Sequence, residues 1–92
     1  MYVQLKNKYY DWSIRKNKWL IKNRNISFEE IKSAIEENRV LIDMKHPTLI
    51  KQRLLIFNKN NYAYVAPYVE DTQKIFFKTI YPSRKYTKKY LP

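Results

Sequence analysis

The chain contains no glycine, which restricts the backbone conformations available to its turns. Glycine adopts positive φ most readily, and asparagine is the side chain that best replaces it there. The segment NKNN at 58–61 separates two apolar runs, so it is predicted to be a hairpin turn built from asparagine. A chain without glycine also cannot form the usual glycine-rich phosphate loops, and nothing indicates a P-loop or a dinucleotide site.

Length and composition predict one small domain, residues 1–92. Cysteine is absent and His46 is the one histidine, so neither a disulfide framework nor a structural zinc site is expected, and we expect no metal and no cofactor. No apolar run approaches the roughly 20 residues that cross a bilayer. The N-terminal segment lacks the apolar core of a signal peptide. We therefore expect a cytoplasmic protein with no membrane partner.

The net charge of +11 favours a polyanion or an acidic protein as partner. Residues 1–25 hold seven Lys or Arg against one Asp, residues 73–92 hold six and no acid, and residues 26–50 are net acidic. If the two ends meet in the fold, they form one basic face. An AT-rich coding sequence is an equally good explanation for part of the basic excess.

The first half of the chain predicts one strand and two helices. The strand falls within Tyr2–Trp12, and Ser13 caps a helix over IRKNKWLIKNR that stops at the asparagines near residue 25. Its expected apolar side is Ile14, Trp19, Leu20 and Ile21, and its polar side is Lys16, Lys18, Lys22 and Arg24.

The segment ISFEEIKSAIEEN carries the clearest helix signal. Ser27 and Glu30 fit a capping box, and Ile26 and Ile31 fall at the hydrophobic-staple positions. One apolar face with helical spacing follows, made of Phe28, Ile31, Ala34 and Ile35.

The second half predicts strands at RVLIDM, QRLLIFN, YAYVAPYV and KIFFKTIY, with a second turn at EDTQ, residues 70–73. Pro67 indicates a bulge, or a register in which its missing N–H faces outward. Pro82 ends the last strand and Ser83 caps a final helix. The expected fold is α+β: a small antiparallel meander, two helices in the N-terminal half and a short C-terminal helix.

Three parts of the sequence together resemble the BrnT family of bacterial toxins, within the RelE-like ribonuclease superfamily. The first match is an ungapped segment. The second consists of three residues at the end of one expected strand and the start of the next, and the third lies near the C-terminus. The first comprises Tyr10, Trp12, Lys16, Asn17 and Ile26–Glu30; the second Asp43, His46 and Arg53; the third Ile80, Arg84, Lys85, Thr87 and Lys88. The chain departs from the family by having Ser13 for Asp, Arg24 for His, Asn25 for Gly, and Pro82-Ser83 for Ser-Ala.

The resemblance implies an α+β fold and metal-independent RNA cleavage that inhibits translation. It implies a cognate antitoxin whose acidic or folding-on-binding segment covers the basic face. Promoter DNA would be bound only indirectly, through that antitoxin.

Metal-free RNA cleavage needs a base for the 2′-hydroxyl, an acid for the leaving oxygen, and cations for the transition state. Arg53 and Arg84 are the first candidates for a clamp, because a guanidinium binds two phosphate oxygens at once. An ion pair with Asp43 is an equally good reading of Arg53, and a solvated tail charge is the alternative for Arg84.

His46 is a candidate acid or base, although HPTLIK also reads as a plain turn. Lys85 or Lys88 can take the proton-transfer role if neighbouring charges lower a lysine pKa. Arg84 and Lys88 are spaced i, i+4 and project together from a helix, as do Lys85 and Lys89.

Lys16, Lys85, Lys89, Tyr86 and Tyr90 are the predicted RNA contacts, because single-stranded RNA needs cations and stacking rings. Trp12, Trp19 and the other tyrosines can stack on bases too, but aromatic residues in strands more often pack in a core. The leading hypothesis is a ribonuclease toxin. The alternatives are a basic nucleic-acid-binding module without catalysis and an antitoxin-like module that only binds protein.

Overall fold

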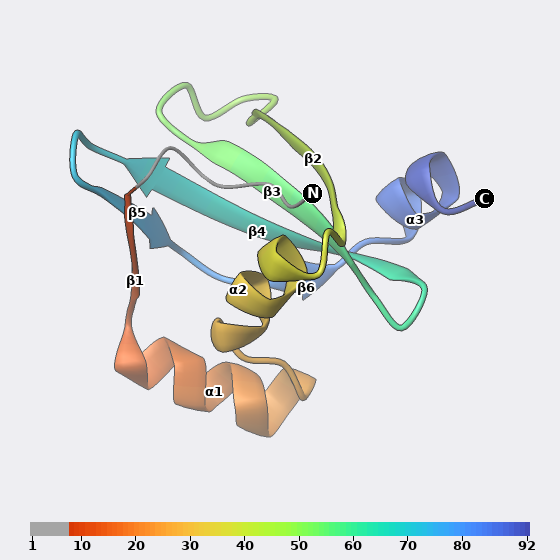
Figure 1. Ribbon diagram of the computed structural model, residues 1–92, viewed down its shortest axis with the longest axis horizontal. Helices are drawn as coiled ribbons and strands as arrows, with labels where there is room; N and C mark the ends of the chain where they lie inside the picture. The colour runs from red at the N-terminus through yellow and green to blue at the C-terminus, as the bar shows by residue number, and fades with distance from the viewer. Residues whose placement is uncertain (1–7) are drawn as a thin grey trace.

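The computed structural model describes residues 8–92, and within that range the protein is α+β (Figure 1). The predicted class is confirmed, as is the first strand for the part that is described. The elements in chain order are β1 (Tyr9–Trp12), α1 (Ile14–Arg24), α2 (Glu29–Glu36), β2 (Val40–Lys45), β3 (Arg53–Lys59), β4 (Tyr62–Glu70), β5 (Lys74–Phe77), β6 (Tyr81–Pro82) and α3 (Arg84–Tyr90). None of these helices has the length and apolar character needed to cross a bilayer.

The sheet is mixed rather than purely antiparallel. Its order is β1-β5-β4-β3-β2, with β6 beside β4. β2 to β5 form the expected antiparallel meander, but β1 pairs with β5 in parallel. The expectation of an antiparallel sheet is therefore wrong at this edge, because residue composition within a strand carries no information about the direction of a distant neighbour.

The turn between β3 and β4 is the asparagine hairpin. Lys59 pairs with Tyr62, so the loop has two residues, Asn60 with φ 54° and Asn61 with φ 61°. Two successive positive φ values are what a type I′ turn requires. The prediction that asparagine replaces glycine here is confirmed.

Each face of the sheet packs a separate core. On one face, Leu55, Phe57 and Tyr68 are buried under residues that α1 and α2 supply, among them Leu20 and Ile31. The opposite face packs a smaller core in which Tyr86, Tyr90 and Leu91 from the C-terminal segment cover the strands; its other buried members are Leu54, Ile56, Ala63 and Val65. The sheet therefore separates α1 and α2 from α3.

Between β5 and β6, opposite Pro67 of β4, the pairing register shifts by one residue. Tyr68 pairs with Phe77, whereas Val65 pairs with Tyr81 rather than with Ile80. The Pro67 carbonyl accepts from the Lys78 N–H at 2.8 Å. The predicted bulge is confirmed, and it lies in the segment opposite Pro67, which stays in regular register with Leu54 of β3.

Helix α1 has the predicted caps but not the predicted apolar side. Ser13 Oγ accepts from the Lys16 N–H, and Asn25 ends the helix with φ 53°. Leu20 is buried, but Ile14 and Ile21 are 72% and 52% exposed. The prediction is therefore right for Leu20 and wrong for Ile14, Trp19 and Ile21. The side of the helix that faces the core carries Leu20 and a polar residue, Asn17.

Asn17 joins the two helices. It is 8% exposed, its Oδ1 accepts from the Phe28 N–H at 2.7 Å, and its Nδ2 donates to Glu29 Oε1 at 2.8 Å. The hydrogen bond from Asn17 is the main cause that lowers the pKa of Glu29. Asn17 thus caps the start of α2 from another helix.

The capping box is half formed. The Glu30 carboxylate accepts from the Ser27 N–H at 2.9 Å, whereas the Glu30 N–H bonds the Ser27 carbonyl rather than its hydroxyl. Ile26 and Ile31 are both buried, and the predicted apolar face of this helix is confirmed.

We predict that Asn17→Ala lowers the free energy of unfolding by about 1–3 kcal/mol, because it leaves the buried Phe28 N–H without a partner. Urea denaturation measures the change. Asn23→Ala is the matched control: it alters the same residue type in the same helix, where the side chain is exposed, and it should cost less than about 0.5 kcal/mol. Equal losses in the two variants would contradict the capping role.

We also predict opposite effects for two changes at the hairpin. Asn61→Gly should preserve or raise stability, by up to about 1 kcal/mol, because glycine has no steric penalty at positive φ. Asn61→Ala should lower stability by about 1 kcal/mol. Thermal unfolding of both variants checks the turn, and a more stable alanine variant would contradict it.

Candidate functional site

The predicted site residues lie on two separate surfaces. Arg53 pairs with Tyr68 and lies on the sheet face that α1 and α2 cover. Arg84 begins α3 on the other face, where Thr87 Oγ1 accepts from the Ala63 N–H at 2.8 Å. Along β4, Ala63 and Tyr68 are about 17 Å apart at the usual rise per residue. The structure therefore does not bring Arg53 and Arg84 together as one clamp.

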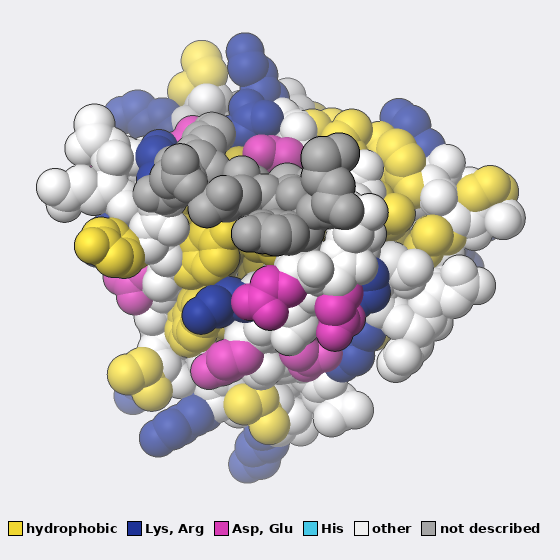
Figure 2. Space-filling view, viewed as in Figure 1, with side chains coloured by type: hydrophobic (Ala, Val, Ile, Leu, Met, Phe, Trp, Pro, Cys, Tyr) yellow, Lys and Arg dark blue, Asp and Glu magenta, His cyan; other side chains and the backbone are white. Residues whose placement is uncertain are grey.

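Although β1 and β5 are neighbouring strands, the cations of α1 and those of α3 do not form one basic face in the described residues. α1 and α3 lie on opposite sides of the sheet. In Figure 2, acidic side chains gather over α2, and Lys and Arg side chains project from the edge where α1 lies. The hypothesis of a single basic face is replaced by two cationic surfaces.

Helix α3 is anchored to the sheet. Ser83 Oγ accepts from the Tyr86 N–H at 3.2 Å, as the sequence predicted, and Thr87 Oγ1 also donates to the Ser83 carbonyl at 2.7 Å. The four cations of the helix are exposed: Arg84, Lys85, Lys88 and Lys89. This segment is a docked helix with a cationic outer side.

Tyr86 belongs to the core. It is 7% exposed and stacks on Tyr90 with ring centroids 6.1 Å apart. Lys85 and Lys89 place their ammonium groups 5.3 and 5.5 Å from the centroids of Tyr86 and Tyr90. Because its ring is buried, Tyr86 does not offer a face to a base, and Tyr90 is only half-buried.

A cavity of about 280 Å³ brings two predicted catalytic residues together. His46 follows β2, Arg53 begins β3, and residues 46–52 connect the two strands. The full lining is Lys45, His46, Ile50, Lys51, Gln52, Arg53 and Glu70. Sequence analysis did not single out Glu70 or the two lysines, although alternation along YAYVAPYVE places Glu70 on the same face as Tyr68.

The ring of His46 is held by its own loop. Its Nδ1 accepts from the Thr48 N–H at 3.1 Å and from the Leu49 N–H at 3.0 Å. In the neutral ring the proton is therefore on Nε2. A general base at Nε2 would need the proton on Nδ1, which breaks both bonds. With this geometry, the Nε2–H of His46 can donate a hydrogen bond to a ligand.

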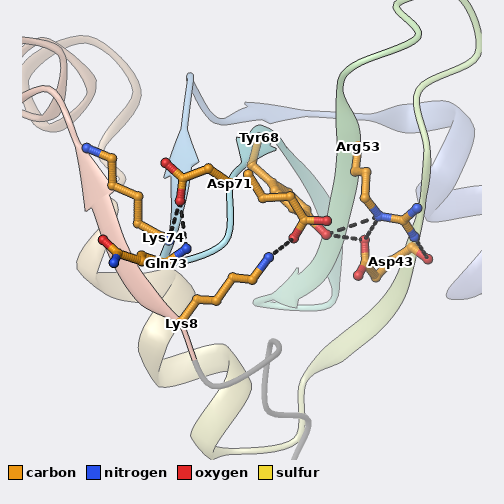
Figure 3. Close-up of polar contacts among 8 residues, drawn as sticks. Lys8, Asp43, Arg53, Tyr68, Asp71, Gln73 and Lys74 are labelled. Atoms are coloured by element: carbon orange, nitrogen blue, oxygen red, sulfur yellow. Dashed lines mark hydrogen bonds and ion pairs between the residues drawn. The ribbon is translucent and has the colours of Figure 1, made fainter.

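Arg53, Asp43 and Tyr68 form a partly buried cluster (Figure 3). Arg53 Nε donates to Asp43 Oδ1 at 3.1 Å and to the Tyr68 hydroxyl at 3.2 Å, and Tyr68 donates to Asp43 Oδ1 at 2.7 Å. Arg53 Nη2 also donates to the Asp43 carbonyl at 3.3 Å. The ion pair considered for Arg53 is present, and it orients the guanidinium at the cavity.

Burial and hydrogen bonding set the protonation of this cluster. Burial raises the pKa of Tyr68, and the hydrogen bond to the Asp43 carboxylate raises it further. Burial opposes the charge of Arg53, but its pKa still rises because Tyr68 and Asp43 stabilise the guanidinium. Tyr68 is thus a neutral phenol and Arg53 a permanent cation at neutral pH.

The remaining wall of the cavity carries a carboxylate. Glu70 Oε2 lies 3.3 Å from Lys8 Nζ, an ion pair that joins the end of β4 to the segment before β1. Within residues 8–92, including the cavity, no three His, Asp or Glu side chains gather as a potential metal site. The cavity therefore combines Glu70 with Arg53, His46 and two lysines.

We predict that the stabilising effect of the Tyr68 hydroxyl disappears at high pH. The unfolded chain has a tyrosine pKa of about 10. Because the folded pKa is higher, the contribution is complete below pH 10 and is lost as the pH rises toward the folded value. The difference in free energy of unfolding between the wild type and Tyr68→Phe, about 1 kcal/mol at pH 8, should narrow between pH 10 and 11.

Urea denaturation at several pH values measures this difference. Tyr9→Phe is the control, because Tyr9 is exposed, and the change should have little effect on the free energy of unfolding. A Tyr68→Phe difference that stays constant to pH 11 would show that the phenol is not held in its protonated form.

Comparison of the chain with family models, with curated proteins and with solved structures finds no match. A function is therefore inferred from the residues of the cavity and of α3.

Proposed function

We propose that the chain is the toxin component of a type II toxin–antitoxin system, a BrnT-like member of the RelE-like ribonucleases that cleaves RNA without a metal ion and inhibits translation. The observation that carries the proposal is the cavity that places His46 and Arg53 beside Lys45, Lys51 and Glu70. The α+β architecture agrees with the fold that the family resemblance implies.

Two departures from the family pattern are compatible with the same backbone conformation at the ends of α1. Ser13 caps α1 with its hydroxyl, a role that aspartate also fills at this position. Asn25 ends α1 with positive φ, the conformation for which glycine is favoured. These substitutions are compatible with the same local structure, which supports the proposed membership.

The cavity supplies groups for each part of the reaction. The Glu70 carboxylate takes the proton of the 2′-hydroxyl as that oxygen attacks the phosphorus. Arg53 and the Nε2–H of His46 stabilise the charge that develops on the phosphate oxygens. The ammonium group of either Lys45 or Lys51 gives one proton to the leaving 5′ oxygen. The products are a 2′,3′-cyclic phosphate and a 5′-hydroxyl end.

The partner that we propose is a cognate antitoxin protein. An acidic segment complements the cations of the cavity or those of α3, and covering either of them would exclude RNA. Binding to promoter DNA would be indirect, through the antitoxin.

The alternative is a nucleic-acid-binding module without catalysis. Its supporting observation is that Arg53 already donates hydrogen bonds to Asp43 and Tyr68, whereas the four cations of α3 are exposed on the opposite side of the sheet. In this alternative α3 binds the phosphate backbone and the cavity has no catalytic role.

We predict that purified protein cleaves RNA in EDTA and that Glu70→Gln lowers the rate by about 100-fold or more, the usual cost of losing a general base. His46→Asn should also lower the rate, because an asparagine oxygen can accept from the same loop N–H groups but lacks the imidazole donor. Gel analysis of end-labelled RNA measures the rates, and growth arrest on induced expression gives an independent readout.

The variant Arg84→Ala tests whether the active site is the cavity or α3. If the cavity is the active site, this variant weakens RNA binding but keeps the rate at saturating RNA. Loss of that rate in Arg84→Ala, with Glu70→Gln unaffected, would move the active site to α3. A folded, non-toxic wild type that leaves RNA intact would overturn the enzyme and favour the binding module.

A further inference from the structure

The outward side of α1 is a second cationic surface, separate from the cavity. It carries five cations and no acid: Arg15, Lys16, Lys18, Lys22 and Arg24. Because Asn17 and Leu20 face the core, these side chains surround the outer part of the helix. Trp19 lies among them and is 42% exposed.

Cations flank the indole of Trp19. Lys16 Nζ lies 4.2 Å and the guanidinium carbon of Arg24 4.9 Å from the ring centroid. A hollow of about 220 Å³ lies beside the ring, lined by Ser13, Arg15, Lys16 and Trp19. A partly exposed indole next to positive charge is the combination on which single-stranded nucleic acids stack.

The surroundings hold this arrangement in place. Arg24 Nη1 donates to the Ile80 carbonyl at 2.7 Å, which ties the guanidinium to the segment between β5 and β6. Asn23 Nδ2 donates to the Trp19 carbonyl at 2.9 Å. Since Leu20 anchors the helix in the core, a ligand meets a largely preorganised ring and cation.

We propose that the Trp19 hollow is a subsite for single-stranded RNA. Lys16 moves from the ring to a flanking phosphate beside Arg15, and one base takes its place on the indole. This inference rests on the proposed ribonuclease function and extends it. The hollow shares no residue with the cavity, so it governs the affinity for RNA and not the chemical step.

An acidic protein segment is the other ligand that this charge could attract. A protein partner would gain most from aliphatic contacts, but the hollow has no aliphatic side chain in its lining. The exposed isoleucines of the helix, Ile14 and Ile21, share one helix face at i, i+7 spacing, but neither lines the hollow. The ring and its cations therefore favour a base and its phosphates.

Tryptophan fluorescence tests the subsite directly. Trp12 is half-buried and stacks on Phe28 at 5.5 Å, so Trp12→Phe leaves Trp19 as the one reporter. A decamer of deoxyadenylate is the probe, because it lacks the 2′-hydroxyl and cannot be cleaved by the proposed reaction. We predict quenching on titration, and about tenfold weaker binding of a labelled decamer to Trp19→Ala in the otherwise wild-type chain.

Lys16→Ala and Lys32→Ala are matched charge changes on neighbouring helices. Lys16→Ala should weaken binding and reduce its dependence on salt, because one phosphate contact is lost. Lys32→Ala, on the acidic α2, should alter neither. Equal effects of the two changes would reduce the surface to general charge attraction and overturn the subsite.

An abasic decamer and polyglutamate identify the ligand class. An abasic strand that binds as tightly as deoxyadenylate would overturn stacking, and polyglutamate that displaces the decamer and quenches Trp19 equally would assign the surface to an acidic protein. RNA cleavage in EDTA is measured separately. Cleavage without Trp19 quenching overturns the subsite alone, whereas quenching without cleavage overturns the nuclease and leaves an RNA-binding surface.

Discussion

The register shift opposite Pro67 decides the layout of the molecule. Proline has no N–H to donate, so the ladder between β4 and its neighbour on that side cannot continue uniformly. An extra residue is accommodated between β5 and β6. In a regular strand Tyr81 would share a face with Phe77. The shift instead leaves Ile80 in the core with Phe77 and turns Tyr81 toward the opposite core.

The change of face at Tyr81 has a direct consequence for function. The chain that leaves β6 forms α3 on the face opposite α1 and α2, with Tyr86 buried against the sheet. The cations of α1 and those of α3, which the sequence alone would combine, are therefore separated by the sheet. An RNA that contacts the cavity, α1 and α3 would have to follow the outside of the domain.

Two buried polar groups adjust the structure locally. Asn17 supplies the acceptor that the first turn of α2 lacks, which connects the helices by specific bonds rather than by apolar contact alone. The Tyr68 hydroxyl lies between Asp43 and Arg53 and, together with Asp43, orients the guanidinium. Both residues are far in sequence from their partners, and neither position carries a local signal for its role.

Several features could be predicted because their causes are local. The caps at Ser13 and Ser83, the asparagine hairpin and the strands of the meander all depend on residues within a few positions of one another. The face of α2 was also predictable, since its apolar residues follow helical spacing. The apolar side of α1 could not be predicted, because Ile14, Trp19 and Ile21 do not form a continuous stripe at helical spacing.

The sequence by itself determined the α+β class, the turns and the positive charge, because propensities, capping and charge are properties of short segments. Only the tertiary structure decided that β1 joins the sheet in parallel, that His46 and Arg53 share a cavity with Glu70, and that Arg84 lies elsewhere. Those outcomes depend on long-range strand register, in which a single residue of shift moves a side chain to the other face of the sheet.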